Sequence, residues 1–125
     1  KMYEEWRASH LVIIVAPEYH GGMPGSLKNL FDVLAKSDLH NNKVYSCVGV
    51  SSGRGGLKAI QAVQASLINL INSTKAQAYY TTQMLVVSHV EEIFDEKGIL
   101  KDPAFPQRIQ DYLDRILPQA EKWKL

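Results

Sequence analysis

Three stretches of the chain carry the apolar pattern of buried strands. Residues 11–16 form an unbroken apolar run, Leu-Val-Ile-Ile-Val-Ala, which is typical of a strand buried on both faces. Residues 43–50 read Lys-Val-Tyr-Ser-Cys-Val-Gly-Val, and residues 79–87 are rich in Tyr, Thr and Val, a composition that favours strands. The pattern therefore predicts three strands, well separated along the chain.

The segments between and after these strands carry helical periodicity. Apolar residues spaced three and four apart predict one helix after the first strand, a long helix over residues 57–71 and a last helix near the C-terminus. We also expect the tail of an amphipathic helix over residues 2–9 and irregular structure over residues 88–100. The three apolar faces are Leu27, Leu30, Phe31 and Leu34; Ile60, Val63, Leu67, Leu70 and Ile71; and Ile109, Tyr112, Leu113, Ile116 and Leu117.

Polar residues, proline and glycine predict where these helices begin and end. Pro24 suits the first turn of a helix that ends near Ser37, and the polar residues 38–42 then indicate a turn. Asp102 is expected to cap the last helix, with Pro103 in its first turn.

The resulting order is strand, helix, strand, helix, strand, helix. Such alternation predicts an α/β fold with a parallel sheet and right-handed crossovers. A chain of 125 residues is long enough for one domain, whereas a closed eight-stranded α/β barrel needs about 200 residues or more. We therefore expect an open, doubly wound parallel sheet with helices on both faces, which makes three layers.

Composition and charge narrow the class of protein. Apolar residues make up 46% of the chain and charged residues 22%, as in ordinary globular domains, and the longest apolar run has six residues. A net charge of +1 gives no bulk attraction to nucleic acid or to an anionic membrane. The single cysteine, Cys47, indicates a reducing, cytoplasmic setting and is expected to be a buried, inert thiol. The four histidines are scattered without metal-ligand spacing, so no metal site is expected.

The most informative motif follows the first predicted strand. Residues 17–29 read Pro-Glu-Tyr-His-Gly-Gly-Met-Pro-Gly-Ser-Leu-Lys-Asn. A loop at the carboxyl end of a strand is where open α/β sheets bind their ligands, and Gly21 and Gly22 let the main chain approach a flat molecule. A Pro-Glu-Tyr-Asn/His-Gly loop running into Pro-Gly-x-Leu-Lys-Asn resembles the NAD(P)H-dependent FMN reductases of the flavodoxin-like superfamily.

This resemblance implies a function. Members of that family bind FMN, take a hydride from NADPH or NADH and reduce flavins, quinones, azo compounds or metal oxyanions. They are usually homodimers, often tetramers, and the helix after the Pro-Glu-Tyr loop commonly lies at the subunit contact. The cofactor supplies the hydride chemistry, so the resemblance implies no catalytic acid or base from a side chain. The expected partner is a small-molecule electron acceptor.

The resemblance also implies which residues line the flavin. The second loop, residues 51–56, is rich in glycine and corresponds to a loop that touches the pyrimidine end of the ring in that family. Main-chain N–H groups at the start of the following helix would suit negative charge on a reduced ring. Where the family most often has Asn, this chain has His20. The expected flavin-binding residues are Pro17, Glu18, Tyr19, His20 and Gly21 in the first loop, and Ser52, Gly53, Gly55 and Gly56 in the second.

Two features of a whole flavodoxin-like sheet are not found in these 125 residues. That sheet has strand order 2-1-3-4-5, and this chain supplies what correspond to strands 3, 4 and 5. The run over residues 11–16 would then be an exposed apolar edge, so we expect strands 1 and 2 to be missing or to come from another chain. The family's phosphate-binding loop, of the type Gly-Ser-x-Arg-x-x-Ser, is also absent. The chain is therefore expected to be the C-terminal two-thirds of one flavodoxin-like FMN reductase domain.

Two other functions remain open at this stage. A non-catalytic flavodoxin-like module that has lost FMN and acts through its dimer surface would explain the absent phosphate loop. Residues 49–53, Gly-Val-Ser-Ser-Gly, also match the G-x-S-x-G elbow of serine hydrolases. That elbow is followed by an acid and then a histidine, whereas His89 is the last histidine here and precedes Asp95.

Overall fold

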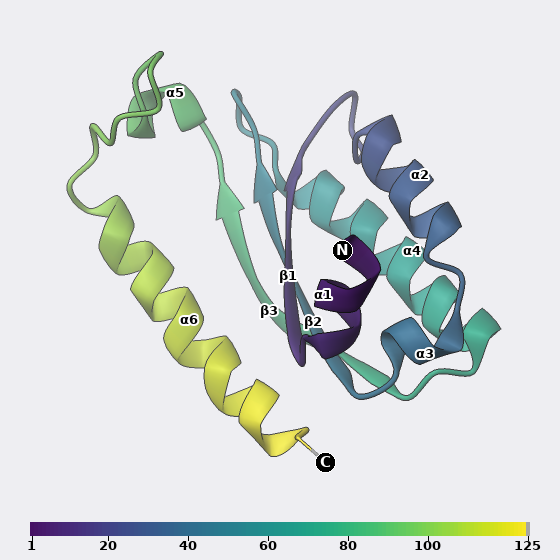
Figure 1. The fold of residues 1–125 in the computed structure, drawn as a ribbon. Helices are drawn as coiled ribbons and strands as arrows, with labels where there is room; N and C mark the ends of the chain where they lie inside the picture. Colours follow the sequence, from purple (N-terminus) through teal and green to yellow (C-terminus); the bar gives the residue numbers. More distant parts are fainter. Residues whose placement is uncertain (125) are drawn as a thin grey trace.

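The computed structural model describes residues 1–124 and has an α/β architecture (Figure 1). The elements are α1 (Met2–Ala8), β1 (Leu11–Pro17), α2 (Gly25–Val33), α3 (Ser37–His40), β2 (Lys43–Val50), α4 (Leu57–Thr74), β3 (Ala78–Val87), α5 (Val90–Ile93) and α6 (Phe105–Lys122). The three strands form one parallel sheet in the order β1-β2-β3. The predicted open sheet with helices on both faces is thus confirmed, and no helix within residues 1–124 is long and apolar enough to cross a membrane.

Helices cover the two faces of the sheet separately, which gives three layers. α2 and α4 lie on one face together with α1 and α3, and α6 lies on the other (Figure 1). The first core is built around the buried residues Ala16, Tyr45 and Leu67, and the second around Val87 and Ile116. Both faces of β2 are therefore covered, which explains why its apolar run is nearly continuous.

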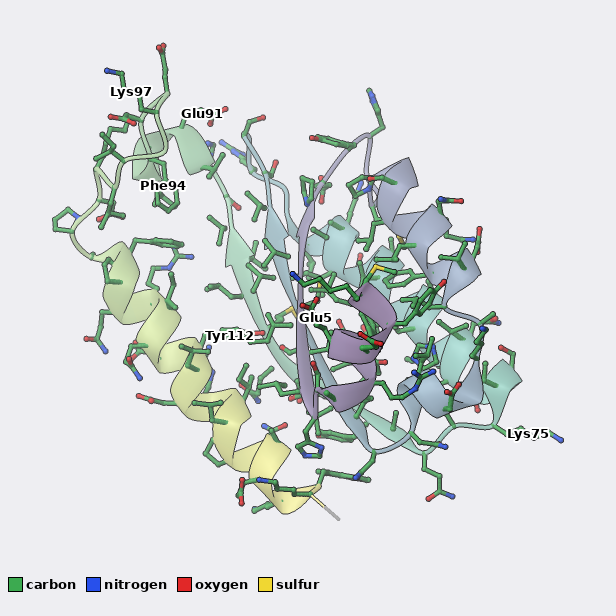
Figure 2. The ribbon with its side chains drawn as sticks, in the orientation of Figure 1. Glu5, Lys75, Glu91, Phe94, Lys97 and Tyr112 are labelled. Atoms are coloured by element: carbon green, nitrogen blue, oxygen red, sulfur yellow. The ribbon has the colours of Figure 1, made fainter. Side chains whose placement is uncertain are left out.

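The outer edge of β1 has no partner strand among the described residues. On the face of β1 that is turned towards α6, Ile13 is 37% and Val15 62% exposed, whereas Ile14 and Ala16 on the other face are buried. Ile13 and Val15 border an apolar hollow of about 340 Å³ between the sheet and α6, which also reaches Val48 and Tyr112. Figure 2 shows Tyr112 pointing from α6 towards the sheet, where its hydroxyl hydrogen-bonds Ser46 Oγ. The predicted apolar edge is therefore present.

Several predicted boundaries are wrong, each for a local reason. Residues 38–42 were expected to form a turn, but only residues 41–42 do so; α3 extends to His40, and Leu39 and His40 are fully buried. α2 ends at Val33, and Pro24 is its N-cap with extended geometry (φ −63°, ψ 147°) instead of a residue in its first turn. The segment expected to be irregular after β3 contains the short helix α5.

The last helix also begins later than expected. α6 starts at Phe105, because Asp102 Oδ1 accepts the Ala104 amide at 2.9 Å in a turn that precedes the helix. The proline of its first turn is consequently Pro106 and not Pro103. The buried face of the helix consists of Phe105, Tyr112, Ile116 and Ala120, while the predicted face residues Ile109 and Leu117 are exposed.

A buried histidine connects α2, α3 and β2. The ring Nε2 of His40 donates to the carbonyl of Leu34 at 2.6 Å, so Nδ1 accepts the hydroxyl of Tyr45, also at 2.6 Å. Burial lowers the pKa of His40 below its ordinary value of 6.5, the Leu34 carbonyl raises it, and the neighbouring cation of Lys43 lowers it further. The ring is therefore held neutral in the fold.

We expect this histidine to make stability depend on pH. Below about pH 6.5 the unfolded chain takes up a proton on His40 before the folded chain does, so the free energy of unfolding falls as the pH is lowered. The contribution is fully present above pH 6.5. Urea unfolding at several pH values between 7.5 and 5.5 measures the slope, and His40→Gln should flatten it. An equal slope in the variant would contradict the assignment.

Candidate functional site

The three strands end level with one another, and this brings three loops together. Pro17 pairs with Val50, and Val50 pairs with Val87, so the last residues of β1, β2 and β3 lie in one row. The loops that follow leave the same edge of the sheet, at the top of Figure 1. In an open parallel sheet this carboxyl edge is where ligands bind.

The first loop contains a tight hairpin turn. The amides and carbonyls of Tyr19 and Gly22 exchange hydrogen bonds of 2.9 and 3.0 Å. The two residues between them have positive φ, 51° for His20 and 77° for Gly21, as in a type I′ turn. The position of His20 thus requires a left-handed backbone, a conformation in which Asn, Asp and His are enriched. This explains why His can stand where the resembling family most often has Asn.

The effect of a substitution at His20 on stability should depend on how well the new residue adopts positive φ, and not on the chemistry of its side chain. We expect His20→Asn to leave stability unchanged or slightly raised, and His20→Val to lower the free energy of unfolding by about 1–2 kcal/mol, because a β-branched residue disfavours positive φ. Urea unfolding checks both. If the Asn variant were as destabilised as the Val variant, a contact of the imidazole would have to be invoked instead.

Glu18 joins the first loop to the second. Its amide donates to the carbonyl of Val50 at 2.7 Å, and its carboxylate Oε1 accepts the amides of Gly56 and Lys58, each at 3.0 Å. Gly56 is the N-cap of α4 and has φ 119°, a conformation that favours glycine. The side chain of Lys58 extends back to the first loop, where its Cδ would lie 3.6 Å from a Cβ added at Gly21.

The third loop, residues 88–89 between β3 and α5, contacts the second loop from the side opposite Glu18. The hydroxyl proton of Ser88 is shared between the carbonyls of Arg54 and Gly55, whose oxygens lie 3.0 and 2.7 Å from Oγ. The amide of His89 donates to the carbonyl of Gly53 at 2.8 Å, and the amide of Val90 to that of Ser51 at 3.0 Å. The carbonyls of Ser51, Gly53, Arg54 and Gly55 therefore face residues 88–90. Main-chain N–H groups of the second loop remain unbonded by them.

Several main-chain amides on these two loops have no acceptor among residues 1–124. They belong to His20, Gly21, Ser52, Arg54 and Gly55. The edge of an isoalloxazine ring carries carbonyl oxygens and ring nitrogens that accept hydrogen bonds, so donors of this kind suit it. The residues present thus fit a flavin ring.

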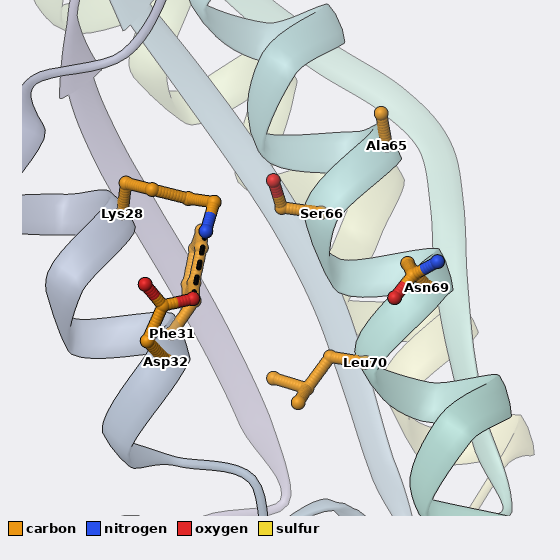
Figure 3. A pocket seen from close by; sticks show the side chains of 7 residues that line it. All are labelled: Lys28, Phe31, Asp32, Ala65, Ser66, Asn69 and Leu70. Atoms are coloured by element: carbon orange, nitrogen blue, oxygen red, sulfur yellow. Dashed lines mark hydrogen bonds and ion pairs between the residues drawn. The ribbon is translucent and has the colours of Figure 1, made fainter.

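An apolar wall stands beside the first loop. Tyr19 is 59% exposed and borders a hollow of about 530 Å³ with Val15, Pro17, Leu27 and Leu30. Another hollow, of about 290 Å³, lies between α2 and α4 next to the ion pair of Lys28 and Asp32 (Figure 3). None of the predicted flavin-binding residues lines this hollow, so the hollow beside Tyr19 is the better candidate for a ligand site.

Comparison with known proteins identifies the family. The sequence profile described as NADPH-dependent FMN reductase matches residues 1–90, well over half of the chain. This chain belongs to the NADPH-dependent FMN reductase family.

Individual relatives agree with that membership. The chain is 31% identical to a quinone reductase of Pseudomonas putida over 119 residues, which are 90% of this chain and 60% of the relative. It is 36% identical to an NADPH azoreductase of Bacillus sp. strain OY1-2 over 61 residues, 49% of this chain and 34% of that protein. The chain thus spans less than two thirds of the length of either relative.

A solved structure with the same fold is the flavoenzyme NAD(P)H:(acceptor) oxidoreductase FerB of Paracoccus denitrificans. It superimposes with a TM-score of 0.79 at 19% identity, over 99% of this chain and 68% of that one. The NADH:FMN oxidoreductase EMOB in its apo form gives a TM-score of 0.52 at 15% identity, over 91% and 55% of the two chains. The predicted flavodoxin-like fold is therefore confirmed.

The fold of this FMN reductase family member brings both predicted loops to one sheet edge. It also shows that Lys58, Ser88 and His89 contact the two loops. The sequence did not predict these contacts, because the three residues belong to no recognisable motif. One expectation changes, because two amides at the start of α4 that were expected to face the flavin are bonded to Glu18. The roles of the nine residues as flavin ligands remain predictions.

Nothing in the site supports a serine hydrolase. Ser51 Oγ accepts the amide of Gly53 at 3.2 Å in a local turn, and within residues 1–124 no imidazole hydrogen-bonds it. The thiol of Cys47 is also unsuited to catalysis, because burial raises its pKa to about 12.

Proposed function

We propose that this chain carries the flavin-binding part of an FMN-dependent oxidoreductase that takes hydride from NADPH or NADH and reduces a flavin, quinone or azo-type acceptor. The observation that carries the proposal is the set of unbonded amides on residues 17–22 and 51–56, at the carboxyl edge of a flavodoxin-like sheet. Family membership supports it, and the relatives are named as quinone reductase and NADPH azoreductase.

The residues of the chain would bind and orient the ring. The amides of His20 and Gly21 would donate to one end of it, and those of Ser52 and Gly55 to the other, where the ring gains negative charge. Tyr19 and the apolar side chains beside it would exclude water from one face. FMN, when bound, supplies the hydride-accepting chemistry, and no side chain near the loops is needed as an acid or base.

We further propose that the described sheet is three strands of a larger flavodoxin-like sheet. The unpaired edge of β1, its exposed apolar side chains and the share of the relatives that the chain spans support this. Further strands of the same domain would pair with the outer edge of β1, the segments that connect them would cover Ile13 and Val15, and a phosphate-binding loop would lie among them. A homodimer or tetramer and a cytoplasmic location are proposed from the family resemblance, and light scattering would measure the oligomeric state.

The first test is a visible absorption spectrum of the purified protein, repeated after FMN is added and the excess removed. We expect retained flavin bands that bleach when NADPH or NADH is added under nitrogen. A chain without the phosphate-binding loop should also bind riboflavin about as tightly as FMN, because phosphate contacts contribute the difference. Complete failure to retain either flavin would contradict the proposal.

One observation supports a second candidate function, that of a non-catalytic module. The 125 residues contain no Gly-Ser-x-Arg-x-x-Ser sequence, and charge-assisted hydrogen bonds to a phosphate are worth about 1.5–3 kcal/mol each. A non-catalytic flavodoxin-like module acting through its dimer surface would need no such loop. It predicts a stable oligomer that binds neither FMN nor riboflavin, which the same spectrum and light scattering distinguish.

A further inference from the structure

The carboxylate of Glu18 caps the N-terminus of α4, which is the longest of the helices on that face of the sheet. α4 has 18 residues, and the amides of its first turn have no partners within the helix. Glu18 Oε1 accepts two amides at this end, those of Gly56 and Lys58. The helix end favours an anion, and a side chain 38 residues earlier in the chain provides it.

The second loop leaves room for this carboxylate. A Cβ added at Gly55 would lie 2.3 Å from Glu18 Oε2 and 2.8 Å from its Cδ. Any side chain at this position would therefore displace the carboxylate. The glycine at position 55 is required by the neighbouring Glu18, in addition to any approach of a ligand.

The same residue also binds β2 through its main chain. The Glu18 amide donates to the carbonyl of Val50 at 2.7 Å, and its carboxylate accepts the amide of Lys58. The backbone and the side chain of Glu18 thus hydrogen-bond to the two ends of residues 50–58. From the opposite side Ser88 and His89 bind the carbonyls of the same segment. The second loop is therefore fixed between the first and third loops.

We propose that Glu18 is a positioning residue: its carboxylate fixes the second loop against the first and neutralises the positive end of α4, and it is not itself a ligand of the flavin. This inference rests on the proposed function. In this arrangement the amides of Ser52 and Gly55 would donate to the pyrimidine end of the ring. The amides at the start of α4 would not, because Glu18 accepts them. The charge of Glu18 would then oppose the negative charge that the ring gains on reduction.

Three variants separate the two roles of the carboxylate. Glu18→Ala removes both the hydrogen bonds and the charge. Glu18→Gln keeps an oxygen acceptor and removes only the charge. Gly55→Ala keeps the charge and displaces the carboxylate. Glu96→Gln, at an exposed carboxyl in the hairpin after α5, is the matched control.

The first readout is hydrogen exchange of individual amides in the protein without flavin. We expect the Gly56 and Lys58 amides to exchange roughly tenfold faster or more in Glu18→Ala, since each loses a hydrogen bond to a charged group. Gly55→Ala should do the same, Glu18→Gln should be intermediate, and Glu96→Gln should match the parent. The Val63 amide, in the middle of α4, should exchange equally in all of them and so reports that the helix is intact.

The second readout is the flavin itself. Glu18→Ala and Gly55→Ala should weaken flavin binding at least tenfold, because the second loop is no longer held in place. Glu18→Gln should retain most of the affinity and move the flavin reduction potential to a more positive value, since the opposing charge is gone. Glu96→Gln should change neither quantity.

Each result decides something. Unchanged exchange at Gly56 and Lys58 in Glu18→Ala would overturn the inference outright. Faster exchange with unaltered flavin affinity and potential would also overturn it, because Glu18 would then be only a helix cap. If the parent protein bound no flavin while exchange responded as expected, the proposed function would fail and the fixing of the second loop by Glu18 would stand.

Discussion

Gly49→Ala is expected to lower the free energy of unfolding by about 3 kcal/mol or more. A Cβ at this position in β2 would lie 2.0 Å from the carbonyl oxygen of Gly56 and 2.9 Å from Ile60 Cγ1. The first of these atoms belongs to the main chain at the start of α4, so it cannot move without shifting the helix away from the sheet. Urea unfolding followed by circular dichroism measures the change.

Gly25→Ala is the matched control for this prediction. Gly25 is the first residue of α2, and a Cβ there meets no atom within 4 Å. Alanine is the better helix former, so this variant should be neutral or slightly more stable. Equal stability of the two variants would show that α4 does not pack on β2 as closely as described.

Ile116→Ala should cost about 3 kcal/mol, because Ile116 is fully buried between α6 and the sheet. Its neighbour Leu117 is 50% exposed, so Leu117→Ala should cost less than about 1 kcal/mol. Both residues belong to the face predicted from sequence, and the comparison tests which of them the fold actually buries. Urea unfolding of the two variants side by side gives the answer, and similar losses would contradict the described orientation of α6.

The sequence predicted the strands well because their patterns are local. The run from Leu11 and the strand ending at Val50 were expected with errors of one residue at most, since a strand buried on both faces is apolar throughout. The starts of α2 and α6 were less accurate. Pro24 and Asp102 each suit more than one position near a helix N-terminus, and only packing decides between them.

The site was predictable in its location and less so in its contacts. The motif after β1 and the glycines after β2 lie where the family resemblance placed them, because parallel strands bring their carboxyl ends to one edge. The bonding of Glu18 to Gly56, and of Ser88 to Gly55, joins residues more than 30 positions apart. No spacing rule connects such residues, so these contacts had to come from the structure.

The bonds that hold residues 51–56 have a consequence for the order of folding. The loop depends on Glu18 on one side and on Ser88 and His89 on the other, and these lie more than 30 residues away in opposite directions. Closing such loops costs chain entropy before any contact is gained, so this segment should order only after β1 and β3 have both joined β2. The platform offered to a cofactor would then be among the last parts of the chain to form during refolding.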